Sequence, residues 1–258
     1  MTDMPDVTVS KDWLVEHVGD DSVVILDTRP KVAYSYGHIP NSVSLTVDQM
    51  IRVSENGAHL APDVGDASSL LGSLGIDQSR TVVVTGESMD PSAARVAWTL
   101  QYLGQSNTKI LDVGIGTWQG LGLPLTRAQK GPTPSEFVPS VKGQMRIESG
   151  ELKEALGKVT VLDARTLQEF FAGHIPGSVL IPFTDGVGQG GGLFESREFL
   201  QKMFEEKRIT GERELVCYCM HGHRASSLFY QLQIAGFERV RLYDGSFVDW
   251  YSRRLGLE

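Results

Sequence analysis

The sequence has little cysteine and no long apolar run. Its 258 residues include two cysteines, Cys217 and Cys219, with a single residue between them. Such a pair cannot build an ordinary disulfide framework, so the chain fits a reducing compartment and we expect a cytoplasmic protein. No segment is apolar and long enough to suggest a membrane span or a secretory signal.

Positive charge is also scarce. Lys and Arg number 24 against 32 Asp and Glu, which gives a net charge of −8. Nucleic acid and anionic membrane are therefore not expected as partners. The apolar content of 41% allows a real core, and the length suits one or two domains. A site that handles an anionic substrate would need positive charge concentrated locally.

The chemistry-bearing stretch is residues 215–226, Leu-Val-Cys-Tyr-Cys-Met-His-Gly-His-Arg-Ala-Ser. Residues 215–218 predict a buried strand, because they are mostly β-branched and apolar. Residues 225–235 carry apolar residues at helical spacing and precede Gly236, which predicts a helix that ends there. Cys219 would then lie at the start of the helix, where backbone N–H groups and the helix dipole stabilise a thiolate.

Residues 219–224 are the candidate site. Cys219 is the candidate nucleophile, whereas Cys217, two residues earlier inside the strand, is typical of an inert buried thiol. Arg224 adds a charge that persists at every working pH. Gly222 and Met220 complete the candidate substrate-binding loop, with Met220 either a loop wall or a contact to the other domain.

His221 and His223 have two interpretations. With Cys219 they spell Cys-x-His-x-His, which could suggest a metal site. A structural zinc site needs four ligands, and no second Cys/His pair with ligand spacing is present, so we expect no metal. We interpret both histidines as hydrogen-bond donors to an anion.

The chain repeats itself. Residues 27–40 contain Asp-x-Arg followed by His-Ile-Pro, and both recur in residues 163–176, 136 positions later. Trp118 recurs as Trp250, 132 positions later. The sequence is therefore a tandem duplication with a four-residue length difference. Because both copies keep Asp-x-Arg and the His, we expect these residues to be structural.

Strands alternating with helical patterns predict an α/β fold, with two homologous domains that each have a mainly parallel sheet flanked by helices. We place the N-terminal domain at residues 1–125, a proline-containing linker at 126–144, and the C-terminal domain at 145–258. The first nine residues predict an irregular start. Residues 185–193 hold a glycine cluster, a weak nucleotide motif that we interpret as a loop.

The N-terminal copy lacks the candidate nucleophile. At the 132-residue offset, Cys219 corresponds to Glu87 and Arg224 to Ser92. The alignment could slip by one or two residues, but no cysteine precedes Cys217. We therefore expect a catalytically inactive N-terminal copy that serves as scaffold.

Three motifs carry a family resemblance. Cys219-x-x-Gly222-x-Arg224-Ala-Ser resembles the active-site loop of rhodaneses, residues 243–250 resemble their C-terminal signature, and residues 163–178 resemble their N-terminal signature. The resemblance spans essentially the whole chain. It implies a sulfurtransferase that moves a sulfane sulfur from thiosulfate, or a related donor such as 3-mercaptopyruvate, to cyanide or a small or protein thiol. The intermediate would be a Cys219 persulfide, and no further cofactor is implied.

The sequence departs from the family at the donor side. Vertebrate members carry a basic residue four positions after the Arg of Asp-x-Arg, where this chain has Glu169. The loop resembles that of many bacterial members, and neither the loop associated with thiosulfate nor that associated with mercaptopyruvate. The donor therefore stays open. Arg224 would position a small anionic donor, or would only tie the loop to an acidic neighbour.

Two other functions compete with sulfur transfer. A cysteine-dependent phosphatase also uses a Cys loop that ends in Arg, but with five intervening residues, whereas this loop has four. A non-catalytic binding or sulfur-carrier module is the other alternative, and the intact loop argues against it.

Overall fold

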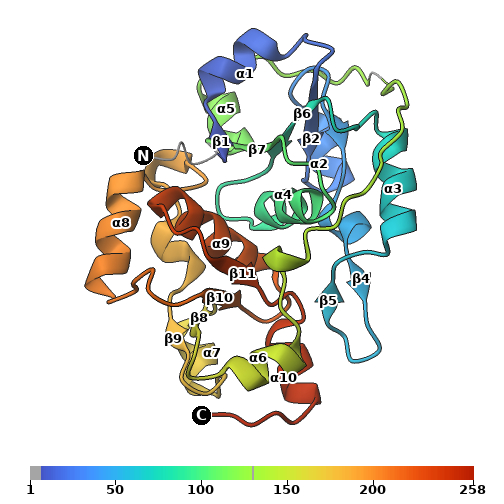
Figure 1. Ribbon diagram of the computed structural model, residues 1–258. Helices are drawn as coiled ribbons and strands as arrows, with labels where there is room; N and C mark the ends of the chain where they lie inside the picture. Colours follow the sequence, from blue (N-terminus) through green and yellow to red (C-terminus); the bar gives the residue numbers. More distant parts are fainter. Residues whose placement is uncertain (1–6, 130) are drawn as a thin grey trace. The chain divides into compact units, whose positions relative to one another are not determined.

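The structure, a computed structural model, describes residues 7–129 and 131–258. They form two compact units (Figure 1). The first comprises the described part of Met1–Ile51, with Pro62–Lys142 and Gly188–Phe194. The second comprises Arg52–Ala61, Gly143–Val187 and Glu195–Glu258. Every helix in the described ranges is too short or too polar to cross a bilayer.

The first unit is built on a five-stranded parallel sheet of order β1-β7-β6-β2-β3. Its strands are β1 (Thr8–Val9), β2 (Val23–Asp27), β3 (Val43–Ser44), β6 (Thr81–Thr85) and β7 (Thr108–Leu111). The expected irregular start is wrong at residues 8–9, because their backbone pairs with β7; residues 1–6 lie outside the described part. Strands β2 and β6 have apolar middles, Val-Ile-Leu and Val-Val-Val, as expected for strands covered on both faces.

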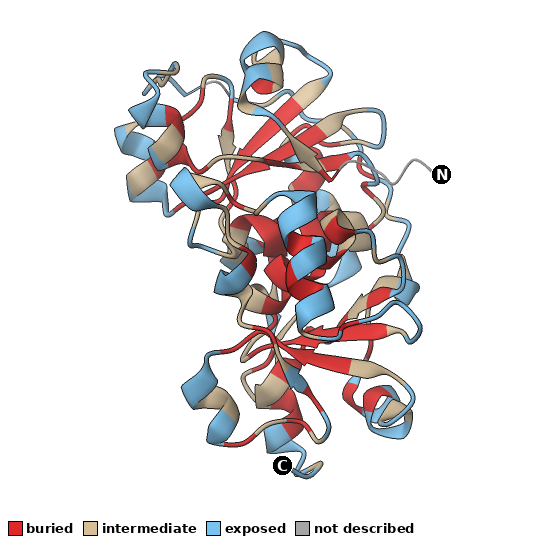
Figure 2. Cartoon of the chain, turned by 90° about the vertical axis from the view of Figure 1, so that its left-hand side faces the viewer, coloured by how far each residue is buried: buried red, intermediate tan, exposed pale blue. Residues whose placement is uncertain are grey.

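Helices flank this sheet. They are α1 (Lys11–His17), α2 (Lys31–Tyr36), α3 (Val64–Ser73), α4 (Ser92–Tyr102) and α5 (Ile115–Gly120), with the 3-10 turns η1 (Val47–Met50) and η4 (Gln189–Gly191). Ser10 caps α1 by accepting a hydrogen bond from the Trp13 N–H. Figure 2 shows largely buried strands and helices whose outer faces are exposed.

The second unit has a four-stranded parallel sheet of order β11-β10-β8-β9. Its strands are β8 (Thr160–Asp163), β9 (Val179–Leu180), β10 (Leu215–Tyr218) and β11 (Val240–Leu242). Its helices are α6 (Ser149–Ala155), α7 (Leu167–Phe171), α8 (Arg197–Glu206), α9 (His223–Ala235) and α10 (Ser246–Ser252), with the turns η2 (Gly143–Met145) and η3 (Phe183–Gly186). The predicted α/β class with two similar parallel sheets is confirmed.

Each unit also contains a short segment from the other half of the sequence. The antiparallel hairpin β4 (Arg52–Val53) and β5 (His59–Leu60) belongs to the second unit. The glycine-rich segment Gly188–Phe194 belongs to the first, where the Gly191 carbonyl accepts hydrogen bonds from the Gly114 N–H and the Ser88 hydroxyl. The two segments begin 136 positions apart, so they occupy equivalent places in the repeat.

Candidate active site

Cys219 lies at the carboxyl end of the sheet in the second unit. Strand β10 runs between β8 and β11, and its last residue, Tyr218, pairs with Asp163. Cys219 follows Tyr218 directly, and α9 begins at His223. The carboxyl edge of a parallel sheet, where a loop leads into a helix, is the usual place for ligands in α/β folds. The predicted strand, turn and helix are thus confirmed, although α9 begins two residues before the predicted Ala225.

The loop of residues 219–222 turns its backbone toward the cysteine sulfur. The Gly222 N–H donates a hydrogen bond to Cys219 Sγ at 3.1 Å. Gly222 has a φ of 84°, a left-handed conformation that glycine adopts without the cost a Cβ would impose. It also precedes α9, whose 13 residues direct the positive end of their dipole toward the loop. Both features favour negative charge on Cys219.

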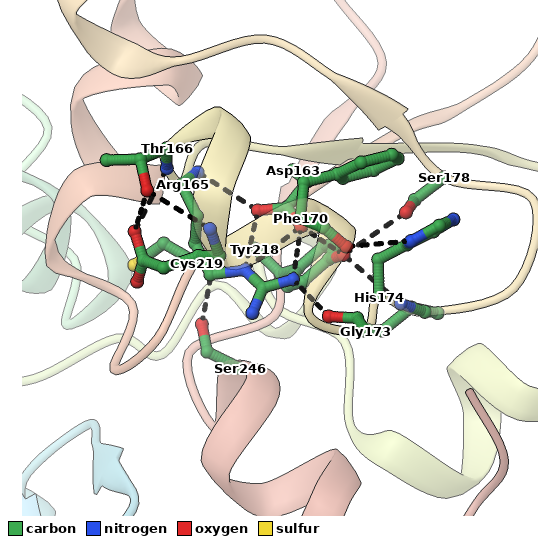
Figure 3. Close-up of polar contacts among 12 residues, drawn as sticks. Asp163, Arg165, Thr166, Phe170, Gly173, His174, Ser178, Tyr218, Cys219 and Ser246 are labelled. Carbon is green, nitrogen blue, oxygen red and sulfur yellow. Dashed lines mark hydrogen bonds and ion pairs between the residues drawn. The ribbon is translucent and has the colours of Figure 1, made fainter. Parts of the chain in front are cut away.

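Helix α10 holds the loop from the other side. The Cys219 N–H donates to Ser246 Oγ at 3.1 Å (Figure 3). In return the Phe247 N–H donates to the Cys219 carbonyl at 2.9 Å, and the Val248 N–H to the Met220 carbonyl at 3.2 Å. Free N–H groups at the start of a helix thereby find acceptors in the loop. Sequence reasoning missed Ser246 as a site residue. The one signal for it was its place in the C-terminal signature of residues 243–250, which does not show a contact with Cys219.

Arg224 has an acidic partner. Its Nη1 and Nη2 donate to the two carboxylate oxygens of Glu169, each at 2.7 Å. Glu169 in turn caps α7 by accepting from the N–H and hydroxyl of Thr166. The hydrogen bond from Arg224 is the main cause that lowers the pKa of Glu169 to about 2. The acidic neighbour that the sequence left open is therefore Glu169.

Arg224 also interacts with the nucleophile. Its pKa is raised first by the hydrogen bond to Glu169 and further by the charge of Cys219. The guanidinium thus lies within electrostatic reach of both the carboxylate and the sulfur.

Three histidines gather around the loop. His59, on β5, has its Nδ1 at 3.1 Å from His223 Nε2, and its ring centroid lies 4.5 Å from that of His221. Nδ1 of His221 is buried with no hydrogen-bond partner among the described residues. Across the ranges that the structure describes, His, Cys, Asp and Glu form no group of three able to hold a metal ion. Sequence reasoning missed His59, because it lies 164 positions from His223.

The buried Asp163–Arg165 pair supports the site without forming part of the loop. Arg165 Nη2 donates to Asp163 at 2.7 Å and to the Gly173 carbonyl at 2.9 Å, and the Tyr218 hydroxyl donates to Asp163 at 2.5 Å (Figure 3). Burial is the main cause that raises the pKa of Tyr218. His174 Nδ1 lies 3.1 Å from the Phe170 carbonyl. The predicted ion pair that fixes this loop is confirmed, and the His has a backbone hydrogen-bond partner, as expected of a satisfied loop histidine.

The first unit shows where the two copies diverge. Thr85 pairs with Asp27 as Tyr218 pairs with Asp163, so Gly86, rather than Glu87, follows the strand as Cys219 does. The expected match of Cys219 to Glu87 is wrong by one residue, because the loop before α4 is longer. The Glu87 carboxylate accepts from the Gly116 N–H at 3.2 Å and lies 3.8 Å from Arg29. A carboxylate therefore lies beside the place that the nucleophile takes in the other copy.

Comparison with known proteins supports the architecture. The family described as rhodanese-like domain matches residues 10–121 and again residues 148–253. The human protein named 3-mercaptopyruvate sulfurtransferase is 31% identical over 256 residues, which cover 93% of this chain and 83% of that protein. The Thermus thermophilus protein named Sulfur carrier protein TtuD is 29% identical over 277 residues, which cover 95% of this chain and 94% of that protein.

A solved structure agrees. The crystal structure of SseA from Escherichia coli, described as a 3-mercaptopyruvate sulfotransferase, has a TM-score of 0.85 at 24% identity and covers 94% of this chain and 99% of that one. That identity supports the fold alone. Two domain matches that together cover most of the sequence, on two units with similar sheets, show that this chain belongs to the rhodanese family and carries two rhodanese-like domains in tandem.

Proposed function

We propose that the protein is a sulfurtransferase in which the C-terminal copy is catalytic and the N-terminal copy is an inactive scaffold. One observation carries the proposal. Cys219 Sγ accepts the Gly222 N–H at the start of a 13-residue helix, and this geometry favours an anionic, nucleophilic sulfur. The same N–H suits a persulfide anion, so the intermediate would be stabilised in the same way as the thiolate.

The reaction has two balanced steps. The Cys219 thiolate attacks the sulfane sulfur of thiosulfate, the S–S bond of the donor breaks, and sulfite leaves with the bonding electron pair. Cys219 then carries a persulfide. Cyanide, or a thiolate, attacks the outer sulfur of that persulfide, and thiocyanate or a new persulfide leaves as the Cys219 thiolate returns. 3-Mercaptopyruvate is the other candidate donor.

The candidate donor-binding residues lie in the same stretch as the sulfur, residues 219–224. Arg224 is within electrostatic reach of Cys219, and His221 and His223 belong to the three-histidine group around the loop. Gly222 supplies the N–H to the sulfur, and Met220 is fixed through its carbonyl by α10. An anionic sulfonate or carboxylate of the donor would bind to these groups rather than to the acidic remainder of the protein.

A sulfur carrier is the second candidate, because the Thermus relative bears that name at 29% identity. Cys219 would carry the same persulfide in both cases. The two functions differ in turnover: the enzyme passes the sulfur on to cyanide or a free thiol, whereas the carrier keeps it until a partner protein accepts it.

The test measures thiocyanate formation from thiosulfate and cyanide, alongside hydrolysis of an aryl phosphate. Intact-protein mass spectrometry after exposure to thiosulfate reports whether one sulfur atom has been added. Cys219→Ser should abolish both thiocyanate formation and the added sulfur while the fold remains, because the role of Cys219 is covalent. Cys217→Ala is the matched control. Its thiol is buried, burial raises its pKa, and we expect most activity to remain.

The outcomes separate the candidates. Thiocyanate formation that depends on Cys219 supports the sulfurtransferase. A stable added sulfur without turnover supports the carrier. Phosphate release without thiocyanate would overturn both, and so would a dead Cys217→Ala variant beside an active Cys219→Ser variant.

A further inference from the structure

The charges around Cys219 are balanced in pairs. The loop arginine, Arg224, is bound to Glu169 by two hydrogen bonds of 2.7 Å. The buried Arg165 of the same unit is neutralised by Asp163 at 2.7 Å. The other groups of this loop that can attract an anion include its backbone N–H groups and the imidazoles of the three-histidine group. A chain with a net charge of −8 therefore surrounds its nucleophile with a site of little net charge.

The partner of Arg224 is fixed by a second set of contacts. Glu169 Oε2 accepts from the Thr166 N–H at 3.0 Å and from its hydroxyl at 2.8 Å, which holds the carboxylate in place independently of Arg224. The side chains of Arg224 and Glu169 are 23% and 26% exposed, so the pair is only partly screened by water. A donor that used Arg224 would have to share the guanidinium with a carboxylate that is already in position.

We propose that Glu169 is a specificity-determining residue that competes with the sulfur donor for Arg224, so that the site favours organic sulfane donors with one negative charge or none over dianions such as thiosulfate. This inference rests on the proposed sulfurtransferase function and refines its donor class. The repulsion from the Glu169 charge grows in proportion to donor charge. Thiosulfate carries two negative charges, and it should suffer twice the energetic penalty of a monoanion.

The test compares two donors that undergo the same S–S cleavage. Thiosulfate is a dianion and benzenethiosulfonate is a monoanion, and both give thiocyanate with cyanide. Glu169→Gln removes the charge, while its amide oxygen can still cap α7. A unit charge removed roughly 7 Å from the donor in a partly hydrated site should raise kcat/KM about 4-fold per donor charge. We expect about 4-fold for benzenethiosulfonate and about 15-fold for thiosulfate, mostly through KM.

The matched control is Glu238→Gln. Glu238 is exposed and follows the far end of α9, so screening should leave its effect on both donors below about 2-fold. A second measurement uses the unmodified protein. Because Arg224 is already neutralised, rising salt should not lower kcat/KM for thiosulfate more than for benzenethiosulfonate.

Each outcome decides the matter. Gains that scale with donor charge in Glu169→Gln support the inference. An equal loss for both donors would mean that Glu169 only orients Arg224, and it would overturn the inference, as would a steep salt-dependent fall for thiosulfate in the unmodified protein. Failure to form thiocyanate from either donor in any variant would instead count against the proposed function.

Discussion

Ser246 should hold the backbone of Cys219, the candidate nucleophile, in position. It is fully buried, and its hydroxyl accepts the Cys219 N–H at 3.1 Å and donates to the Tyr243 carbonyl at 2.9 Å. Ser246→Ala would leave the buried N–H of Cys219 without an acceptor. That loss costs about 1–3 kcal/mol of the free energy of unfolding.

The backbone of Ser246 allows a sharper test. Its φ is 55°, in the left-handed region that disfavours a side chain. Ser246→Gly also loses the hydroxyl, but it relieves about 1 kcal/mol of this strain. We therefore expect the Gly variant to be more stable than the Ala variant, the reverse of the usual order within a helix.

Thermal unfolding and thiocyanate formation check this prediction together. For Ser246→Ala we expect Tm to fall by about 2–10 °C, and kcat/KM to fall about 10-fold or more as the sulfur moves relative to its N–H donor. Ser252→Ala, at the exposed end of the same helix, is the control. Its hydroxyl also makes hydrogen bonds, accepting from Asn56 and donating to the Asp249 carbonyl, so we expect a stability loss of about 0.5–1.5 kcal/mol with kcat/KM changed by less than about 2-fold. An Ala variant as stable and active as the unmodified protein, or a Gly variant less stable than Ala, would refute the reasoning.

Further predictions follow from the loop. Arg224→Ala should lower Tm, because it leaves the Glu169 carboxylate without its cationic partner. In the Glu169→Gln variant, the further change Arg224→Ala should still raise KM for thiosulfate if Arg224 binds the donor. An unchanged KM in that double variant would limit Arg224 to a structural role. The Glu169–Arg224 pair should stabilise the fold by about 1–2 kcal/mol above pH 4.5, the ordinary pKa of Glu169. Since its folded pKa is lowered to about 2, this contribution should disappear as pH falls through that value, and a Tm difference from Glu169→Gln that persists below pH 2 would contradict it. His223→Ala, which removes the contact with His59, should lower kcat/KM for thiosulfate while Tm changes little. A fall in Tm without a selective loss of kcat/KM for thiosulfate would indicate that His223 contributes packing alone.

The local part of the site could be predicted from the sequence. The strand at residues 215–218, the turn at Cys219 and the helix that ends before Gly236 follow from patterns within one short stretch, and the structure confirms them. Helix α9 begins at His223, two residues before the pattern predicts, because Gly222 permits the helix to begin directly after it.

The long-range part could not be predicted in the same way. In the sequence Glu169 stands out only as a departure from a family pattern, and its contact with Arg224 joins positions 55 apart. His59 reaches the loop from a hairpin in the first half of the sequence, and no periodicity records such a contact. The one-residue error at Glu87 arose because a fixed offset cannot show which copy has the longer loop.

The exchange of segments between the two units has a consequence for synthesis on the ribosome. The first unit includes Gly188–Phe194, so its folding cannot be completed when residue 142 has emerged and must wait for about fifty more residues of chain. The second unit needs Arg52–Ala61, which is made early and must remain available until α9 and α10 exist. Neither half of the gene therefore encodes a self-sufficient module, and expression of residues 145–258 alone would yield a nucleophile without His59. Dividing the chain at a single position would therefore not separate the two units.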